Sequence, residues 1–154
     1  MADTSLNENR LSILIWQISN VWQSKIRFSL KNYELSFNEY LILETIYKLK
    51  DKSNNISQQD ICLNSSIDKS VVSLKISKLE QKKLINKIKP FDRRSDRIIL
   101  TPEADLLIEN IIQIIKNEEK KIFDKLGSEI FNFTNSLKLL LGKKIRVRLK
   151  PNDK

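Results

Sequence analysis

The stretch ISQQDICLNSSIDKSVVSLKISKLEQKKLI, residues 56–85, decides the fold because it holds two helices with a turn between them. Ser57 followed by Asp60 has the spacing of a capping box, so a short helix is expected to start there. Residues 64–66, Asn-Ser-Ser, predict a turn. A second helix is expected over 68–83, with an inward face of Val72, Ile76 and Leu79. A short helix, a turn and an amphipathic helix together predict a helix-turn-helix.

The next stretch predicts a pair of strands. LINKIKP, residues 84–90, and RIILT, residues 97–101, both have strand-like composition, and FDRRSD connects them. Thr101 is a good N-cap and Pro102 suits the first helical position, so a long helix should begin directly after the second strand. A two-stranded wing that follows a helix-turn-helix predicts a winged helix.

Helices are also expected on both sides of this unit. Residues 11–30 carry apolar side chains at helical spacing, and Ser36 with Glu39 forms a capping box that predicts another helix start. The inward stripe of that helix is expected to be Leu41, Ile42, Thr45, Ile46 and Leu49. The long helix should run to about Leu126, and a last helix should follow Gly127 and end at Gly142. These terminal helices are too apolar to be covered by so small a domain, so a second copy of the chain is expected to cover them.

Positive charge is concentrated in two segments of the chain. The net charge is +9, and residues 67–97 contain ten basic and four acidic side chains. Residues 143–154 contain six basic and one acidic side chain. A localised basic patch is typical of nucleic-acid binding, although a solvated basic surface would have the same composition. The basic tail, 143–154, is expected to be disordered, with a DNA clamp or an extension of the dimer as alternatives.

Other features of the composition limit the possible classes of protein. No apolar run approaches the ~20 residues of a membrane span, and the first residues lack the layout of a signal peptide. Cys62 is the single cysteine and histidine is absent, so an intrachain disulfide and a His/Cys metal site are not expected. No catalytic arrangement is visible, so no enzyme is expected. Cys62 is expected to be a packing residue, and the protein is expected in the cytoplasm.

Several segments of the chain resemble the MarR family of bacterial transcriptional regulators. Its wing pattern, D-x-R followed by five residues and L-T, matches Asp92, Arg94, Leu100 and Thr101. The segments WQISNVWQSKIRFSL, LSFNEYLILETI and the stretch quoted first resemble its first three helical regions, and the likeness spans residues 11–141. The family usually has Gly before the first wing strand, where Lys83 stands here; that position favours a positive φ.

The resemblance implies a mainly α fold with a small β-wing, a winged helix-turn-helix that dimerises through its N- and C-terminal helices. Residues 1–154 would form a single domain of this type. Within it, 11–34 and 102–141 would be dimerisation helices, and 36–101 would be the DNA-binding lobe. The function implied is a homodimeric regulator, a repressor, that binds double-stranded DNA at the nucleoid, on a pseudo-palindromic A·T-rich operator.

The resemblance also implies roles in DNA binding. Arg94 would enter a narrow minor groove with Asp92 bracing it, while Arg93 and Arg97 would contact phosphates. The alternative is a wing whose charges are merely solvated. The outward residues of the recognition helix would be Lys69, Ser70, Ser73, Leu74, Ser77 and Lys78. Further lysines are expected near phosphates or in solvent, namely Lys75, Lys82, Lys87 and Lys89.

A small aromatic or phenolic effector would release the DNA in such a regulator. The residues expected to line its site are Trp16, Trp22, Ser24, Arg27 and Tyr40, which would offer aromatic walls and one cation. The alternative is that both tryptophans only pack in the core or the dimer. The rival function is a winged-helix architectural or protein-interaction module that shows no preference for a particular operator.

Overall fold

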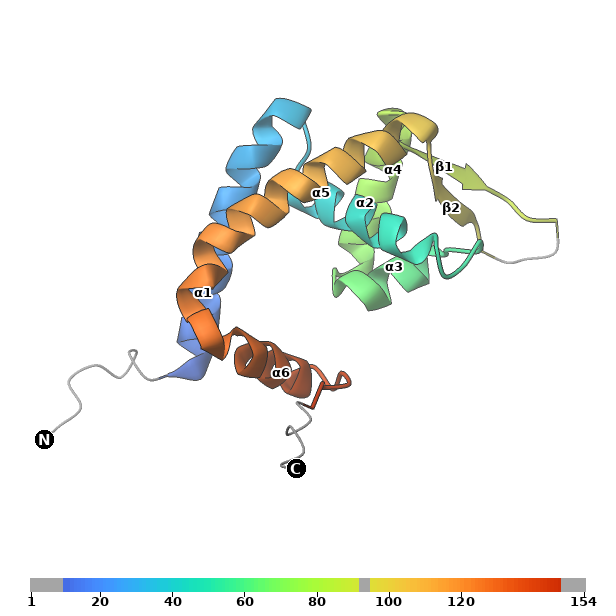
Figure 1. The fold of residues 1–154 in the computed structure, drawn as a ribbon. Coiled ribbons are helices and arrows are strands. Elements are labelled where there is room, and N and C mark those ends of the chain that lie inside the picture. The colour runs from blue at the N-terminus through green and yellow to red at the C-terminus, as the bar shows by residue number, and fades with distance from the viewer. Residues whose placement is uncertain (1–9, 92–94, 148–154) are drawn as a thin grey trace, which may run out of the picture. The chain divides into compact units, whose positions relative to one another are not determined.

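The computed structural model describes residues 10–91 and 95–147. These residues divide into two compact units, and the boundary along the chain lies between Glu118 and Glu119. The elements run in the order helix, helix, helix-turn-helix, wing, long helix and last helix (Figure 1). Their bounds are α1 Leu11–Leu30, η1 Lys31–Tyr33, α2 Phe37–Leu49, α3 Gln58–Ser65, α4 Lys69–Gln81, β1 Ile85–Ile88, β2 Arg97–Leu100, α5 Pro102–Phe123, η2 Asp124–Glu129 and α6 Ile130–Leu140.

Local side-chain caps start α2 and α3 where the sequence predicts them. The Ser36 hydroxyl accepts a hydrogen bond from the Glu39 amide at 3.3 Å, and Glu39 accepts one from the Ser36 amide at 3.0 Å. Ser57 and Asp60 form the same reciprocal pair at the start of α3. Both capping boxes are therefore confirmed, and each satisfies amides that the first helical turn leaves without a partner.

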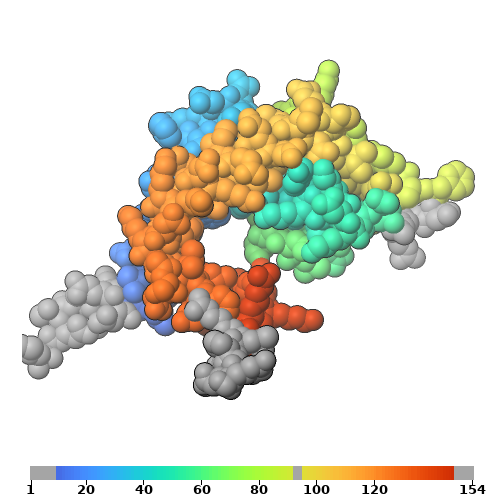
Figure 2. All heavy atoms as spheres, in the orientation of Figure 1, coloured from blue at the N-terminus to red at the C-terminus, as the bar shows by residue number. Residues whose placement is uncertain are grey.

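The wing is a two-stranded antiparallel sheet. Ile85 pairs with Leu100, and Ile88 pairs with Arg97 at the other end. The amide of Ile98 also donates to the carbonyl of Ile56 at 2.8 Å, and this hydrogen bond joins β2 to the segment before α3. In the space-filling view the yellow-green wing stands out from the helices of its unit (Figure 2). The fold class, mainly α with a small β-wing, is confirmed.

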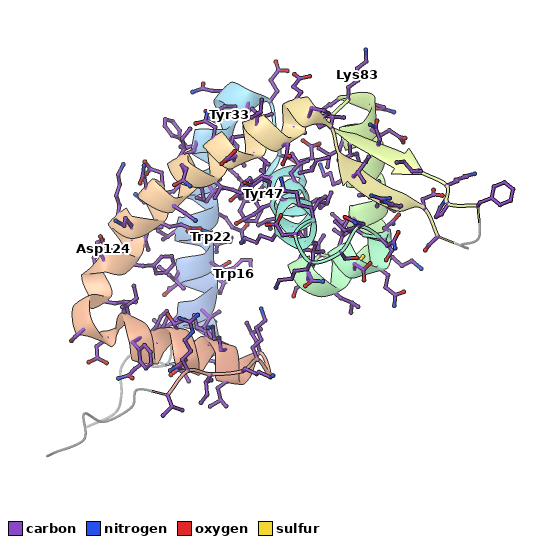
Figure 3. The ribbon with its side chains drawn as sticks, turned by 45° about the vertical axis from the view of Figure 1, so that its right-hand side comes forward. Trp16, Trp22, Tyr33, Tyr47, Lys83 and Asp124 are labelled. Atoms are coloured by element: carbon purple, nitrogen blue, oxygen red, sulfur yellow. The ribbon has the colours of Figure 1, made fainter. Side chains whose placement is uncertain are left out.

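Lys83 occupies the turn between α4 and β1 with a φ of 58°. This is the left-handed region, which glycine adopts without steric cost and which lysine adopts at a modest cost. Its side chain is exposed and points away from the turn (Figure 3). The positive φ expected at this position is therefore present, and the departure from Gly does not prevent the wing from forming.

The core of the first unit surrounds α2, which contacts α1, α3, α4 and β2. The expected stripe of α2 is only partly right, because Leu41, Thr45 and Leu49 are half-buried. Neighbours on several sides widen the buried face of this helix beyond one stripe. Its fully buried apolar residues are Tyr40, Ile42, Leu43 and Ile46. The core also includes the C-terminal half of α1 and α5 as far as Ile115.

The second unit consists of the end of α5, η2, α6 and the start of the basic tail. Gly127, with a φ of 54°, breaks the helix as expected, although α5 already ends at Phe123. Gly142 also has a positive φ, and the amide of Lys143 donates to the carbonyl of Lys138 at 2.8 Å, which closes a Schellman turn.

The start of the basic tail forms hydrogen bonds with α6. The side-chain amide of Asn135 donates to the carbonyl of Arg146 at 2.6 Å, and its oxygen accepts from the Arg146 amide at 3.1 Å. These two hydrogen bonds join the backbone of Arg146 to α6, and the expected disorder of the tail stays a prediction. The expectation for residues 148–154 lies outside the described part of the chain. Within 10–91 and 95–147, no helix is both long and apolar enough to cross a membrane.

Candidate nucleic-acid interface

The second helix of the helix-turn-helix, α4, presents a continuous outward face. Val72, Ile76 and Leu79 are buried and anchor the helix to the core, as expected. All six residues expected on the outer face are exposed: Lys69, Ser70, Ser73, Leu74, Ser77 and Lys78. Their exposure is confirmed, and their contact with DNA stays a prediction.

The chemistry of this face is mixed. Leu74 is 58 % exposed on an otherwise polar surface, and a leucine there can contact the methyl group of a thymine. Neither Lys69 nor Lys78 forms an ion pair with any residue that the structure describes, so both ammonium groups can meet phosphates.

A cap fixes the start of α4. Asp68 Oδ1 accepts from the Ser70 amide at 2.9 Å and also from the Ser70 hydroxyl. These two hydrogen bonds lower the pKa of Asp68, and the carboxylate suits the positive end of the helix dipole. The Ser70 hydroxyl thus already donates within the protein, which leaves only its lone pairs for a contact with DNA.

Three of the four other lysines pair with carboxylates, which the sequence did not predict. Lys75 and Lys82 both approach the buried carboxylate of Glu39, with Nζ–O distances of 3.9 and 2.8 Å. Lys87, in β1, lies 3.6 Å from Glu80 at the end of α4. Lys75 and Lys82 thus face the first turn of α2, and Lys87 faces the last residues of α4. Lys89 is exposed as expected.

The wing residues on which the minor-groove prediction depends, Asp92, Arg93 and Arg94, lie outside the described residues. Arg97 is half-buried at the start of β2, and its Nε atom is enclosed without a hydrogen-bond partner among the described residues. The expected contact of Arg97 with a phosphate stays a prediction.

Sequence reasoning missed two features of this surface. Phe91, just before the charged part of the wing loop, is fully exposed, and an apolar residue in a charged turn was the available signal. Glu39 is the second feature. Its position in a capping box was visible, but its pairing with a lysine 43 residues later depends on the tertiary fold.

The five residues expected to bind an effector occupy different environments. Trp22 contacts Phe37 edge to face, with ring centroids 5.1 Å apart, and the Arg27 guanidinium lies 5.7 Å from the same ring. Tyr40 is 2 % exposed within the core, whereas Trp16 is 62 % exposed and projects from α1 (Figure 3). Ser24 is exposed on α1. The fold therefore brings Trp22 and Arg27 together, and it favours packing for Tyr40.

Two further expectations concern cysteine and metal sites. Cys62 is a free thiol, half-buried, and packs against the core, in agreement with the packing role expected for it. The structure, over the residues it describes, contains no cluster of three or more His, Cys, Asp or Glu side chains that could hold a metal ion.

Solved structures with the same fold are transcriptional regulators, whereas no protein-family model matches the chain. A MarR-family regulator from Rhodococcus sp. RHA1 has a TM-score of 0.78 and 14 % identity, with 93 % of this chain and 99 % of that chain covered. The DNA complex of MepR from Staphylococcus aureus has a TM-score of 0.77 and 23 % identity, with 88 % and 97 % covered. BpsR from Bordetella bronchiseptica, whose DNA binding is regulated by 6-hydroxynicotinic acid, has a TM-score of 0.74 and 18 % identity, with 88 % and 95 % covered.

The chain thus has the winged helix-turn-helix fold of MarR-family regulators, which confirms the resemblance at the level of the fold. The likeness extends over nearly the whole length of these solved chains. At these identities it defines the fold, and the function must be argued from the residues.

Proposed function

We propose that this chain is a MarR-type transcription regulator that binds a specific DNA operator as a homodimer and represses its target. The exposed face of α4, with two lysines free of described ion pairs beside serines and Leu74, is the observation that carries the proposal. The chain also shares its fold with MepR, which has been solved in complex with DNA. Lysines supply phosphate contacts, and short polar or apolar side chains suit base edges in a major groove.

The wing would add a second point of contact. Arg94 would enter a minor groove, because an A·T-rich groove is narrow and strongly electronegative. Phe91 is exposed in the same loop, and apolar side chains in such loops can pack against sugars and base edges. The operator proposed is accordingly A·T-rich in the regions that the two wings reach.

A second copy of the chain would cover the terminal helices. Large apolar side chains are exposed along α1, among them Leu11, Leu14, Ile15 and Trp16. In α6, the exposed ones include Leu139 and Leu140. Apolar surface of this extent is costly in water and is usual at obligate interfaces. Two-fold symmetry would then place two recognition helices on half-sites about one helical turn apart.

A small aromatic acid would relieve repression. BpsR, one of the solved relatives, is regulated by such a compound. In this chain Trp22, Phe37 and Arg27 offer aromatic surface beside a cation, which suits an aromatic carboxylate. A ligand that binds preferentially to one dimer arrangement would shift the population away from the spacing that the operator requires.

The test is the fluorescence anisotropy of a labelled duplex from upstream of the protein's own gene, against a scrambled duplex, at two salt concentrations. We expect a preference of about 10³-fold or more at physiological salt. Equal and steeply salt-dependent affinity for several candidate duplexes would mean phosphate contacts alone. It would favour the second candidate, an architectural DNA-binding protein, which the net charge of +9 also suits.

A further inference from the structure

Glu39 is a buried carboxylate that accepts from the Ser36 amide of its own helix cap and also pairs with two lysines from α4 and its C-cap. It is 3 % exposed and lies in the first turn of α2. Its Oε2 atom accepts from the ammonium of Lys82 at 2.8 Å, and its Oε1 atom lies 3.9 Å from the ammonium of Lys75. A buried carboxylate without such partners would be strongly destabilising, so these contacts determine how the two helices can pack.

Three contacts between the start of α2 and the recognition helix restrict how that helix can move. Lys75 lies in α4 and Lys82 is the C-cap residue of that helix; they are seven residues apart, about two helical turns, so their side chains lie on the same side of the helix. Lys82 also donates to the carbonyl of Glu34 at 2.7 Å, just before α2. A helix held by side chains two turns apart cannot rotate about its axis or slide along it without breaking an ion pair.

The same contacts separate the lysines of α4 and its C-cap residue, Lys82, into two groups. Lys75 and Lys82 are engaged with Glu39, whereas Lys69 and Lys78 carry no ion pair among the described residues. Positive charge available to phosphates is thereby concentrated on the outward side of the helix. Lysines elsewhere on the helix would attract any duplex, in any orientation, because phosphate contacts carry no sequence information.

We propose that Glu39 is a positioning residue for DNA recognition, which orients α4 through Lys82 and Lys75 and withholds both lysines from phosphates. This inference rests on the proposed function and adds a determinant of specificity away from the outward face. A residue that only stabilised the fold would, when replaced, lower the thermal midpoint and leave the sequence preference of the folded protein unchanged.

The experiment compares E39Q with E80Q in the full-length chain. Both variants replace one carboxylate by its isosteric amide and change the net charge equally. Glu80 lies on the exposed surface of α4 itself and pairs only loosely with Lys87. Affinities for the operator and for the scrambled duplex are measured by anisotropy at a temperature where circular dichroism shows each variant to be folded.

We expect E39Q to reduce the ratio of operator affinity to scrambled-duplex affinity about 10-fold or more, as one mispositioned contact would. Its affinity for the scrambled duplex should fall more steeply with salt, by about one more released counterion per chain. E80Q should change the ratio by less than about three-fold, within the usual scatter of surface substitutions. Hydrogen exchange of the amides in the last turn of α4 should be faster in E39Q than in E80Q.

Two variants at Lys82 test the same ion pair, because the side chain of Lys82 is more exposed than that of Glu39. K82R can still donate to the carboxylate, so the ratio should be preserved, whereas K82M should lower it as E39Q does. Equal ratios for E39Q and E80Q, with K82M like the wild type, would overturn the inference. A wild-type chain without any operator preference would instead overturn the proposed function. The exchange measurement, made without DNA, would then decide by itself whether Glu39 holds α4.

Discussion

At the scale of single residues, the carboxylate of Glu39 shows how a charge can be accommodated inside a small core. Burial alone would raise the pKa of Glu39. The hydrogen bonds from Lys82 and from the Ser36 amide, together with the charges of Lys82 and Lys75, outweigh burial and lower this pKa below 4.5. The ionised form is therefore the one that stabilises the fold.

The pH dependence of stability should report on this carboxylate. Because the pKa of Glu39 is lower in the folded chain than its ordinary value of 4.5, its stabilisation is present above pH 4.5 and is lost as the pH falls further. We expect E39Q to lower the free energy of unfolding by about 1–3 kcal/mol at neutral pH. Chemical denaturation of both proteins across acidic pH should show the two curves converging. A constant difference between them down to the lowest pH would contradict the assignment.

Two adjacent arginines of the wing should differ in what they contribute to DNA binding. Arg94→Ala should weaken operator binding by at least ~1 kcal/mol and relax the preference for A·T pairs where the wing binds. Arg93→Ala should weaken operator and scrambled duplexes alike and reduce the salt dependence by about one counterion. Anisotropy with operators that carry G·C substitutions in the flanking region separates these patterns. Unchanged affinity of folded Arg94→Ala would refute the assignment of the wing.

At the scale of elements, the junction between α4 and β1 places lysine in a conformation that suits glycine. Lys83→Gly should raise the free energy of unfolding by about 0.5 kcal/mol, because relief of the steric cost exceeds the entropy that glycine adds to the unfolded chain. Lys78→Gly is the control. It lies on the exposed face of α4 in the last turn, where glycine still has a lower helix propensity than lysine, so it should instead destabilise by about 0.5–1 kcal/mol. A loss of stability in Lys83→Gly, measured by urea denaturation, would contradict the prediction.

Where the helices start could be predicted from the sequence, but which of their faces are buried could be predicted only in part. The capping boxes of α2 and α3 depend on residues three apart, so their pattern is visible in the chain. The buried face of α2 depends on which neighbours surround it, and the expected stripe therefore omitted Leu43. The pairing of Glu39 with Lys82 and the partial burial of Arg97 depend on the tertiary fold in the same way. Patterns of residues close in the sequence predicted where α2 and α3 start. Which charged side chains form ion pairs became visible only from the contacts between helices.

At the scale of the whole molecule, the charge and the apolar surface are divided along the chain. The basic excess of residues 67–97 belongs to the recognition helix and the wing. The exposed leucines of α6 belong to the second compact unit. This division suits a protein in which one part contacts DNA and another joins two copies of the chain. A dimer also doubles the phosphate contacts, so its affinity for DNA should exceed that of a single lobe by more than two-fold.

Substitutions of two leucines with nearly equal exposure should therefore affect assembly differently. Leu140, in α6, is 72 % exposed, and Leu63, in α3, is 73 % exposed. If α6 lies in the dimer interface, Leu140→Lys buries an unpaired ammonium there and should yield monomers at micromolar concentration, whereas Leu63→Lys should remain dimeric. Light scattering without DNA measures both, and the thermal midpoint of the wild type should rise with protein concentration because dimerisation stabilises the folded chain. A wild-type monomer at micromolar concentration, or equal masses for the two variants, would show that the apolar surface of α6 does not join two copies. The operator-bound form would then need a different arrangement to present two recognition helices.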